Sequence, residues 1–152
     1  MAHYHLEPDA SLSLRDTGSP MGLRILAEGL ELMNELGLEA FTFKKLAERI
    51  GCTEVTVYHY FANKQRLLQY YFQLYWLWLD THCRQEGRSL KDPLERIHGD
   101  IRALCGIWPK EAMAAQLDPA VLRDLVINEG SKSFLHKNVD EDNRLKLFKP
   151  YK

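Results

Sequence analysis

Cysteine is scarce in this chain, where it supplies three of the 152 residues: Cys52, Cys83 and Cys105. The count is odd, the spacing is wide, and no CxxC pair occurs. Disulfide frameworks and zinc knuckles need paired cysteines at short, regular spacing, so the sequence argues against both. We expect three reduced thiols with mostly structural roles, as in a cytoplasmic protein.

Long hydrophobic runs are missing as well. The most apolar stretch, Tyr70–Leu79, contains Gln73 and is too short to span a bilayer. The first residues lack the apolar core of a signal peptide. A formal net charge of -1 means that the chain has no overall basic character. We therefore predict a cytoplasmic protein with no membrane partner, in which DNA binding would depend on local placement of charge.

Sequence motifs of catalysis are also lacking. There is no Gly-rich phosphate loop, no nucleophile elbow and no metalloprotease motif, so we expect no enzyme activity, no catalytic residue and no cofactor. His82 and Cys83, with His98 and Cys105 further along, form the one arrangement that suggests a metal. Adjacent residues point to different faces of a helix, which is poor ligand geometry, so we expect no metal site.

The sequence does contain a series of helical patterns, without repeats or strand-like alternation. Each pattern follows a polar residue that suits an N-cap. These caps are Ser19, Thr42, Thr53, Asn63, Asp92 and Asp118. We predict an all-α fold with a flexible N-terminal arm over residues 1–18, a head over 19–62, a connecting helix over 63–83 and a second helical unit over 84–152.

The first helix contains two glycines, to which we assign different roles. Leu23, Leu26 and Leu30 recur at helical spacing and predict its buried face. Gly29 lies inside the helix at a cost of about 1 kcal/mol relative to alanine, which we interpret as close packing against a neighbouring helix. Gly37 is expected to end the helix.

The connecting helix is apolar around most of its circumference, with a narrow polar face at Arg66, Gln69, Gln73 and Asp80. A helix so widely apolar must be buried on two sides, so we expect it to join the head to the second unit. The helix after it has an apolar residue at every i, i+3, i+7 position, which predicts one buried stripe. That stripe comprises Leu94, Ile97, Ile101, Leu104 and Trp108.

Aromatic residues of this region are also candidates for a ligand pocket. The same residues suit an ordinary helical core, so both interpretations stay open. The candidate pocket residues are Tyr75, Trp78, Ile101 and Trp108.

Residues 42–64 have the layout of a helix-turn-helix, with two short helices around a Gly51-Cys52 turn and the start of a third. On a helical wheel the second of these helices buries one arc and exposes the other. The buried arc holds Val57, Tyr60 and Phe61. The exposed arc holds Glu54, Val55, Tyr58 and His59, flanked by Thr53 and Thr56.

The exposed arc has suitable chemistry for a major groove. Val55 and Thr56 offer methyl groups for thymine, and Glu54 can accept a hydrogen bond from the cytosine amino group. Tyr58 and His59 have the reach to contact phosphate. A purely structural interpretation remains open, in which these residues are helix caps and solvated side chains of a bundle.

The residues RILAEGLELMNELG (24–37) and FTFKKLAERIGCTEVTVYHYFANKQRLL (41–68) resemble the N-terminal domain of the tetracycline-repressor (TetR) family. The resemblance covers about 45 residues and is strongest over TVYHYF and the following lysine. It implies an all-helical homodimer with a three-helix DNA-binding head and a larger C-terminal domain that binds a small effector. It also implies DNA contacts, mainly to phosphate, from Thr42, Thr53, Thr56, Tyr58, His59 and Lys64.

The resemblance places Glu54 and Val55 at positions that tune base preference. Lys44 lies on the outer face of the preceding helix, and we expect it to contact DNA as well. Two departures stand out. Glu54 puts an acid where the family often has a basic or neutral residue. Only residues 84–152 follow the connecting helix, and the family usually has a longer segment there, whose last two helices form the dimer interface. Either the chain is truncated or its dimerisation differs.

From these patterns we expect a one-component transcription regulator. It would be a ligand-responsive repressor that binds a pseudo-palindromic DNA operator as a homodimer. The partners would be double-stranded DNA, a small-molecule effector and a second copy of the chain. The alternative is a helical protein-interaction module that uses the same fold without DNA.

Overall fold

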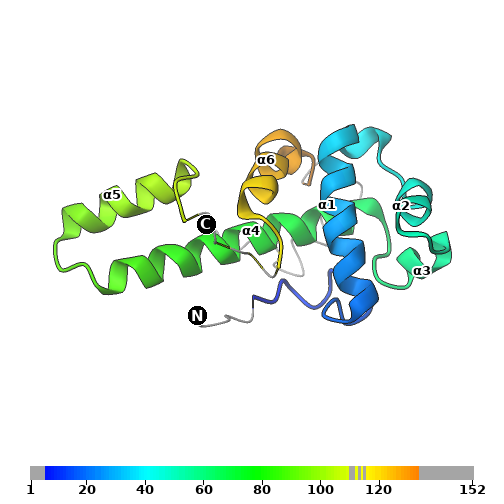
Figure 1. The fold of residues 1–152 in the computed structure, drawn as a ribbon, viewed down its shortest axis with the longest axis horizontal. Helices are drawn as coiled ribbons and strands as arrows, with labels where there is room; N and C mark the ends of the chain where they lie inside the picture. Colours follow the sequence, from blue (N-terminus) through cyan, green and yellow to red (C-terminus); the bar gives the residue numbers. More distant parts are fainter. Residues whose placement is uncertain (1–5, 110–111, 113, 115, 134–152) are drawn as a thin grey trace.

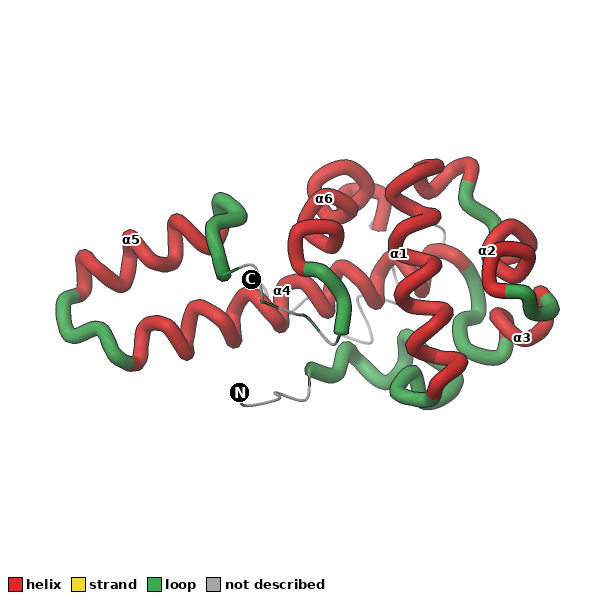
Figure 2. Tube along the Cα trace, viewed as in Figure 1, coloured by secondary structure: helices red, strands yellow, loops and turns green. Residues whose placement is uncertain are grey.

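The computed structural model describes residues 6–109, 112, 114 and 116–133, and this part of the chain is helical without a β-strand. Figures 1 and 2 show the arrangement, in which α4 runs along the molecule, α1, α5 and α6 pack on it, and α2 and α3 lie at one end beside α1. The elements are α1 (Pro20–Ala40), α2 (Phe43–Ile50), α3 (Glu54–Tyr58), α4 (Lys64–Arg88), α5 (Pro93–Leu104), α6 (Pro119–Glu129) and the 3-10 helix η1 (Gly130–Ser133). The predicted all-α fold class is confirmed.

Every predicted N-cap is present in the structure. The side chain of each cap accepts a hydrogen bond from a backbone N–H two or three residues ahead. A cap of this kind stabilises a helix by about 1 kcal/mol, because it satisfies one of the N–H groups that have no partner inside the helix. Local sequence signals therefore determined where these helices begin.

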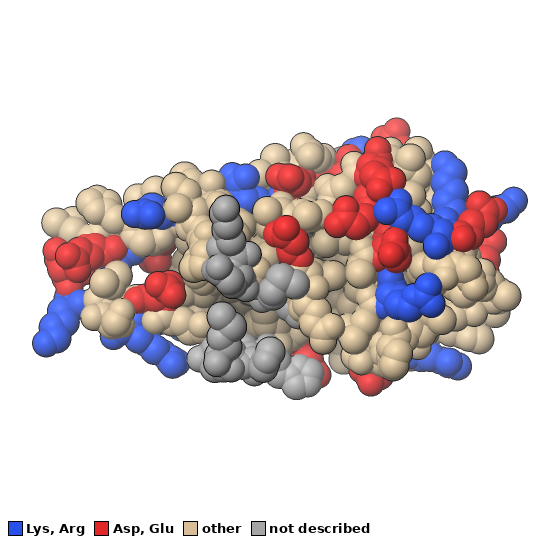
Figure 3. Space-filling view, in the orientation of Figure 1, with Lys and Arg blue, Asp and Glu red and all other residues tan. Residues whose placement is uncertain are grey.

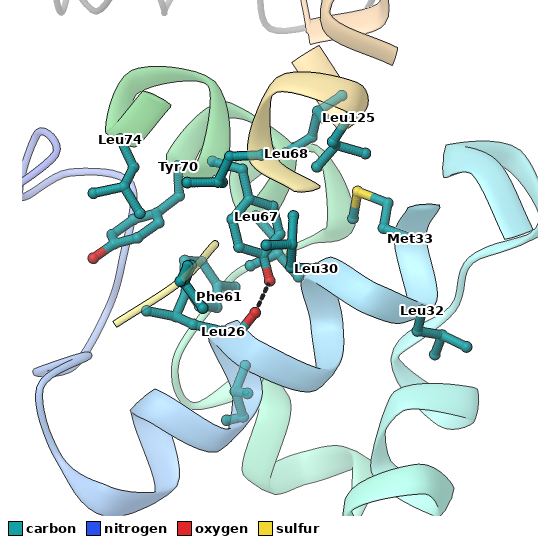
Figure 4. Close-up of a cluster of buried hydrophobic side chains, with 14 of the residues drawn as sticks. Leu26, Leu30, Leu32, Met33, Phe61, Leu67, Leu68, Tyr70, Leu74 and Leu125 are labelled. Carbon is teal, nitrogen blue, oxygen red and sulfur yellow. Dashed lines mark hydrogen bonds between the residues drawn. The ribbon is translucent and has the colours of Figure 1, made fainter. Parts of the chain in front are cut away.

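The core forms where α1, α4 and α6 meet. Figure 4 shows Leu30 of α1, Leu67 and Leu68 of α4 and Leu125 of α6 converging, and each is at most 2% exposed. The two-sided burial predicted for the connecting helix is confirmed over its first half, which packs between α1 and α6. Among the described helices, none is both long and apolar enough to cross a membrane.

Gly29 lies where α4 comes closest to α1. A Cβ atom added at Gly29 would be 2.7 Å from the hydroxyl oxygen of Tyr71. That hydroxyl donates a hydrogen bond of 2.7 Å to the carbonyl oxygen of Leu26. Burial raises the pKa of Tyr71 well above its ordinary value, so the hydroxyl stays protonated and able to donate. The interpretation of Gly29 as a close-packing residue is confirmed.

Gly37 bends α1 and does not end it. The residue has a φ of 73°, and one further turn of helix follows it up to Ala40. Glycine adopts this left-handed conformation at little steric cost, which explains why it occupies the bend. The carbonyl groups of the last turn are left for other parts of the molecule to satisfy.

The segment over residues 6–18 is packed on the bundle, whereas a flexible arm was predicted. Leu12 is only 1% exposed. The backbone N–H of Asp9 donates to the Gln73 side chain at 2.8 Å, and that of Leu14 donates to the Tyr60 carbonyl at 2.8 Å. Because this segment is irregular, it has no periodicity that a sequence pattern could reveal. It also covers part of the polar face predicted for α4.

The α4–α5 hairpin differs from the prediction in two ways. First, α4 continues through Gly87 to Arg88, beyond the predicted end at Cys83. Second, four of the five residues of the predicted apolar stripe lie open to solvent, while Trp108, which follows α5, is partly buried against the core. The exposed fractions of these four are 64% for Leu94, 52% for Ile97, 51% for Ile101 and 50% for Leu104. The reason is geometric: Figure 1 shows α5 lying along the far half of α4, away from α1 and α6.

Substitution of Gly29 by alanine is predicted to lower the free energy of unfolding by about 1–3 kcal/mol. The added methyl displaces the Tyr71 hydroxyl, and this overpacking outweighs the helix-propensity gain of about 1 kcal/mol. Gly99→Ala in α5 is the matched control, because a Cβ there meets nothing within 4 Å. The control should be neutral or slightly stabilising in urea denaturation. Equal effects of the two substitutions would contradict the close-packing account.

Candidate nucleic-acid interface

The helix-turn-helix is formed by α2 and α3, which pack against each other at the end of the molecule remote from α5 (Figure 1). Gly51 makes the turn with a φ of 78°, a left-handed conformation that favours glycine. Val57 anchors α3 in the core with 0% exposure, as the wheel predicted. Arg24 adds a hydrogen bond of 2.8 Å to the carbonyl of Ile50, at the end of α2.

The predicted exposed arc of α3 is exposed in the structure. Val55 is 61% exposed and Tyr58 is 46% exposed, while Glu54 and His59 are also open to solvent. The Tyr58 ring meets the buried Phe43 ring edge-on, with 4.9 Å between their centroids. This contact orients Tyr58 without covering it, so one face of α3 presents apolar, hydroxyl, acidic and imidazole groups together.

Two of the threonines predicted to contact DNA, Thr42 and Thr53, serve as helix N-caps and still carry hydroxyl donors. Thr42 accepts from the N–H of Lys45, and Thr53 accepts from the N–H of Thr56. The hydroxyls of Thr53 and Thr56 lie 2.9 Å apart, so one donates to the other. A hydroxyl has one donor and two acceptor lone pairs. One proton of this pair therefore remains for an outside acceptor such as a phosphate.

Lys64 binds backbone carbonyl groups at the end of α1, a role that the sequence did not predict. Its ammonium donates to the carbonyls of Leu38, Glu39 and Phe41, at 2.7, 3.0 and 3.2 Å. These carbonyls are the ones that the bend at Gly37 and the end of α1 leave unpaired. An ammonium has three donors, so these contacts occupy all of them. Contact between Lys64 and phosphate stays a prediction, and it would require the side chain to leave these carbonyls.

Lys45 and Glu129 also bind backbone groups at the end of α1. We call these groups and the side chains that bind them, Lys64 included, the α1 terminus. The Lys45 ammonium donates to the carbonyl of Ala40 at 2.8 Å. Glu129 of α6 accepts a hydrogen bond of 3.1 Å from the backbone N–H of Leu38, and it pairs with Lys132 at 2.9 Å. Glu129 lies 91 residues from Leu38 in sequence. No local pattern links such distant residues, so sequence reasoning missed this contact.

The charges near α2 and α3 are mixed in sign. Figure 3 shows Lys and Arg interleaved with Asp and Glu at this end of the face it draws. Arg49 is paired with Glu28 and Glu35 of α1, each at 2.8 Å. Hydrogen bonds to Glu35 and then to Glu28 raise the pKa of Arg49. Lys44 lies exposed on α2 and is the predicted interface residue best placed to offer a positive charge to solvent.

The candidate pocket residues are only partly brought together. Trp78 packs edge-on against Trp108 with 5.0 Å between ring centroids, and it lies 6.3 Å from the Tyr75 ring. Ile101 does not join them, because its side chain is on the exposed stripe of α5. A hollow of about 220 Å³ lies elsewhere, between α1 and Leu117. Ile101 therefore does not lie with the other three predicted pocket residues.

Cys83 is a poor nucleophile in this fold. Burial, followed by a hydrogen bond with Asp100, raises the pKa of its thiol to about 11. Cys105, which follows the last residue of α5, is exposed. Within the described ranges, no three His, Cys, Asp or Glu side chains lie close enough together to hold a metal ion.

Comparison with known proteins gives a family match over the helix-turn-helix and its neighbouring helices. Residues 25–71 match the family described as bacterial regulatory proteins, tetR family. The class G tetracycline repressor of Vibrio anguillarum is 46% identical over 44 residues, which are 29% of this chain and 21% of that protein. The class C tetracycline repressor of Escherichia coli is 41% identical over 44 residues, 29% of this chain and 20% of that protein.

A further relative extends the match. The HTH-type transcriptional repressor KstR2 of Mycobacterium tuberculosis is 32% identical over 65 residues, 43% of this chain and 32% of that protein. The alignments thus span between a fifth and a third of the relatives' length. No solved structure gives a significant match. The match to the tetR family is confined to the N-terminal part of this chain, where the sequence resemblance also lies.

Substitution of Lys64 by methionine is predicted to lower the free energy of unfolding by about 1.5–3 kcal/mol. Methionine keeps the length of the side chain but leaves the three carbonyls of the α1 terminus without their charged donor. Lys44→Met is the control, because Lys44 is exposed and a surface change usually alters stability by less than about 0.5 kcal/mol. Urea denaturation measures both. Equal stability of the two variants would contradict the structural role of Lys64.

The thiol of Cys83 should react far more slowly with iodoacetamide at neutral pH than that of Cys105. A pKa of about 11 leaves little thiolate at that pH. Peptide mass spectrometry after timed labelling gives both rates in one sample. Asp100→Asn should accelerate only Cys83, and incompletely, because burial remains. Equal rates at the two cysteines of the unmodified chain would refute the raised pKa.

Proposed function

We propose that the chain is a DNA-binding transcription regulator, most simply a repressor, that acts as a homodimer in the cytoplasm. The observation that carries this proposal is the exposed face of α3, which presents Val55 and Tyr58 to solvent on a tetR-family helix-turn-helix. Exposed aliphatic and aromatic groups together on one helix face are of the kind found at interaction sites. A major groove suits that role, since α3 projects from the end of the molecule.

In this proposal the α3 face reads base edges. Val55 and Thr56 meet thymine methyl groups, and Glu54 accepts from a cytosine amino group. Glu54 also disfavours sites that place a phosphate or another acceptor against it, since like charges repel. Tyr58 and His59 lie at the edge of this face and reach the phosphate backbone.

Phosphate contacts position the head. The helices α2 and α4 begin behind the caps Thr42 and Asn63, and a helix N-terminus attracts anions. The hydroxyls of Thr42 and Thr53 and the ammonium of Lys44 add donors at the same end of the molecule. These contacts do not read sequence, but they fix the register in which α3 does.

A homodimer would place two α3 helices in successive major grooves, about 34–36 Å apart on a pseudo-palindromic operator. We assign the head to residues 19–62, the connecting helix to α4 (Lys64–Arg88) and a second unit to the residues that follow it. Binding of a small effector in the second unit would shift α4 and change the separation of the heads. The effector must bind the released state more tightly, because equal affinity for both states shifts nothing.

Hydrogen bonds between α1 and α6 support such coupling. The Asn34 side chain donates to the carbonyl of Val121 at 3.1 Å, and Glu129 accepts from the N–H of Leu38 at 3.1 Å. A displacement of α6 would therefore act directly on the helix that precedes the helix-turn-helix. The alternative function is a helical protein-interaction module, in which a protein partner covers Val55 and Tyr58 instead of DNA.

DNA binding predicts distinct effects at Tyr58 and Lys44. Tyr58→Ala should weaken binding to duplex DNA, and Lys44→Met should reduce the slope of log affinity against log salt by about one unit, because one phosphate contact is lost. Fluorescence anisotropy with a mixed-sequence duplex measures both. Lys91→Met, remote in the α4–α5 loop, is the control and should change neither. If all three variants match the unmodified chain, the interaction-module alternative is favoured.

A further inference from the structure

The segment over residues 6–18 brings an arginine, Arg15, close to the end of α3. The backbone N–H of Leu14, the residue before it, donates to the carbonyl of Tyr60 at 2.8 Å. Tyr60 directly follows His59, which is the C-cap of α3. The side chain of Arg15 is exposed. The segment therefore adds a positive charge next to the helix whose exposed face is proposed to read DNA.

Contacts on both sides of Arg15 hold its backbone in place. On one side, Leu12 is only 1% exposed and anchors the segment in the core. On the other side, the hydroxyl of Thr17 lies 2.9 Å from the hydroxyl of Tyr70 in α4, so one donates to the other. Because the backbone is already ordered, only the arginine side chain would have to be immobilised on binding, which keeps the entropic cost low.

The acid nearest in sequence to Arg15 is directed elsewhere. The carboxylate of Asp16 accepts a hydrogen bond of 2.8 Å from the backbone N–H of Gly18, which closes a turn. With the residues that the structure describes, the Arg15 guanidinium forms neither a hydrogen bond nor an ion pair. A guanidinium has five N–H donors, and those of Arg15 are left for an acceptor outside this part of the chain.

The cations between residues 19 and 66 are mostly engaged within the fold. The side chains that make hydrogen bonds or ion pairs there are Arg24, Lys45, Arg49, Lys64 and Arg66. Lys44 and Arg15 make neither with any residue in the described ranges. A chain with a net charge of -1 has no overall attraction for DNA, so individual cations of this kind decide whether it binds.

Lys44 and Arg15 are attached near opposite ends of α1. Arg15 precedes the first residue of α1, and Lys44 follows its last residue. Figure 1 shows the segment before α1 at the lower end of that helix and the start of α2 near its upper end, with α3 at a level between them. A recognition helix in a major groove has a phosphate backbone on each side. The two cations are therefore placed to serve different backbones.

We propose that Arg15 binds a phosphate of the DNA backbone on the side of α3 opposite Lys44, which makes the segment before α1 part of the interface. The proposal rests on the proposed function, in which α3 enters the major groove. A planar guanidinium can donate two parallel N–H bonds to one phosphate. The contact reads no sequence, but it fixes the register of α3 from a second side.

The salt dependence of DNA binding tests the contact. Arg15→Met should reduce the slope of log affinity against log salt by about one unit, so the advantage of the unmodified chain should shrink about three- to fourfold between 50 and 200 mM salt. Fluorescence anisotropy with a mixed-sequence duplex measures this. Arg88→Met is the matched control, because Arg88 is exposed at the end of α4 remote from α3 and removes the same charge. Equal slopes for Arg15→Met and the unmodified chain overturn the proposal.

Two further measurements identify the group that Arg15 contacts. Arg15→Lys should restore the slope, because an ammonium also binds phosphate; a lysine variant that behaves like Arg15→Met contradicts a charge-based contact. Duplexes of only A·T or only G·C pairs should show the same loss with Arg15→Met, since phosphates carry no sequence information. A loss confined to the A·T duplex would reveal a minor-groove contact and overturn the assignment to phosphate.

The same titrations separate this proposal from the function on which it rests. If the unmodified chain binds duplex DNA and Tyr58→Ala weakens binding, but Arg15→Met does not, the regulator function stands and the Arg15 contact is refuted. If the unmodified chain fails to bind any duplex at low salt, the regulator function is refuted and the Arg15 contact with it. Circular dichroism of each variant should show unchanged helix content, because the Arg15 side chain is exposed.

Discussion

The unpaired carbonyl groups at the end of α1 are the constraint around which the head is organised. The bend at Gly37 and the exit of the chain into α2 leave these groups without helical partners. Lys64 satisfies three of them from the start of α4, and Lys45 satisfies another from α2. The same bonds fix α2 and α4 relative to α1. The orientation of α3, which is packed on α2, follows from them.

This arrangement also connects the head to the rest of the chain. Glu129 brings α6 to the N–H group that the bend at Gly37 frees, and Asn34 makes a second bond to α6 one turn earlier. The surface proposed to bind DNA, α3, is thus connected to α6 through α1 and α2. A displacement of α6 can reach α3 through these hydrogen bonds and the packing of α1 and α2. It would do so only if an effector binds one arrangement more tightly than the other.

Local signals in the sequence predicted much of this structure. The caps from Ser19 to Asp118, the buried Val57 and the close-packed Gly29 depend on neighbouring residues or on one helical face, and all are confirmed. The failures share a different cause. The apolar stripe of α5 was predicted to be buried, and it is exposed. Residue spacing shows that one face of a helix is apolar, but it does not show what covers that face. Lys64 and Glu129 act over long sequence separations, which no pattern reports.

The central claim is that the exposed face of α3 reads DNA as part of a symmetric pair. The most direct measurement is a binding selection from random duplexes with the full chain, read by sequencing. The account predicts enrichment of an inverted repeat whose half-site centres are about one helical turn, or a whole number of turns, apart. No enrichment at low salt, where phosphate contacts are strongest, would contradict it and favour a protein partner for the α3 face.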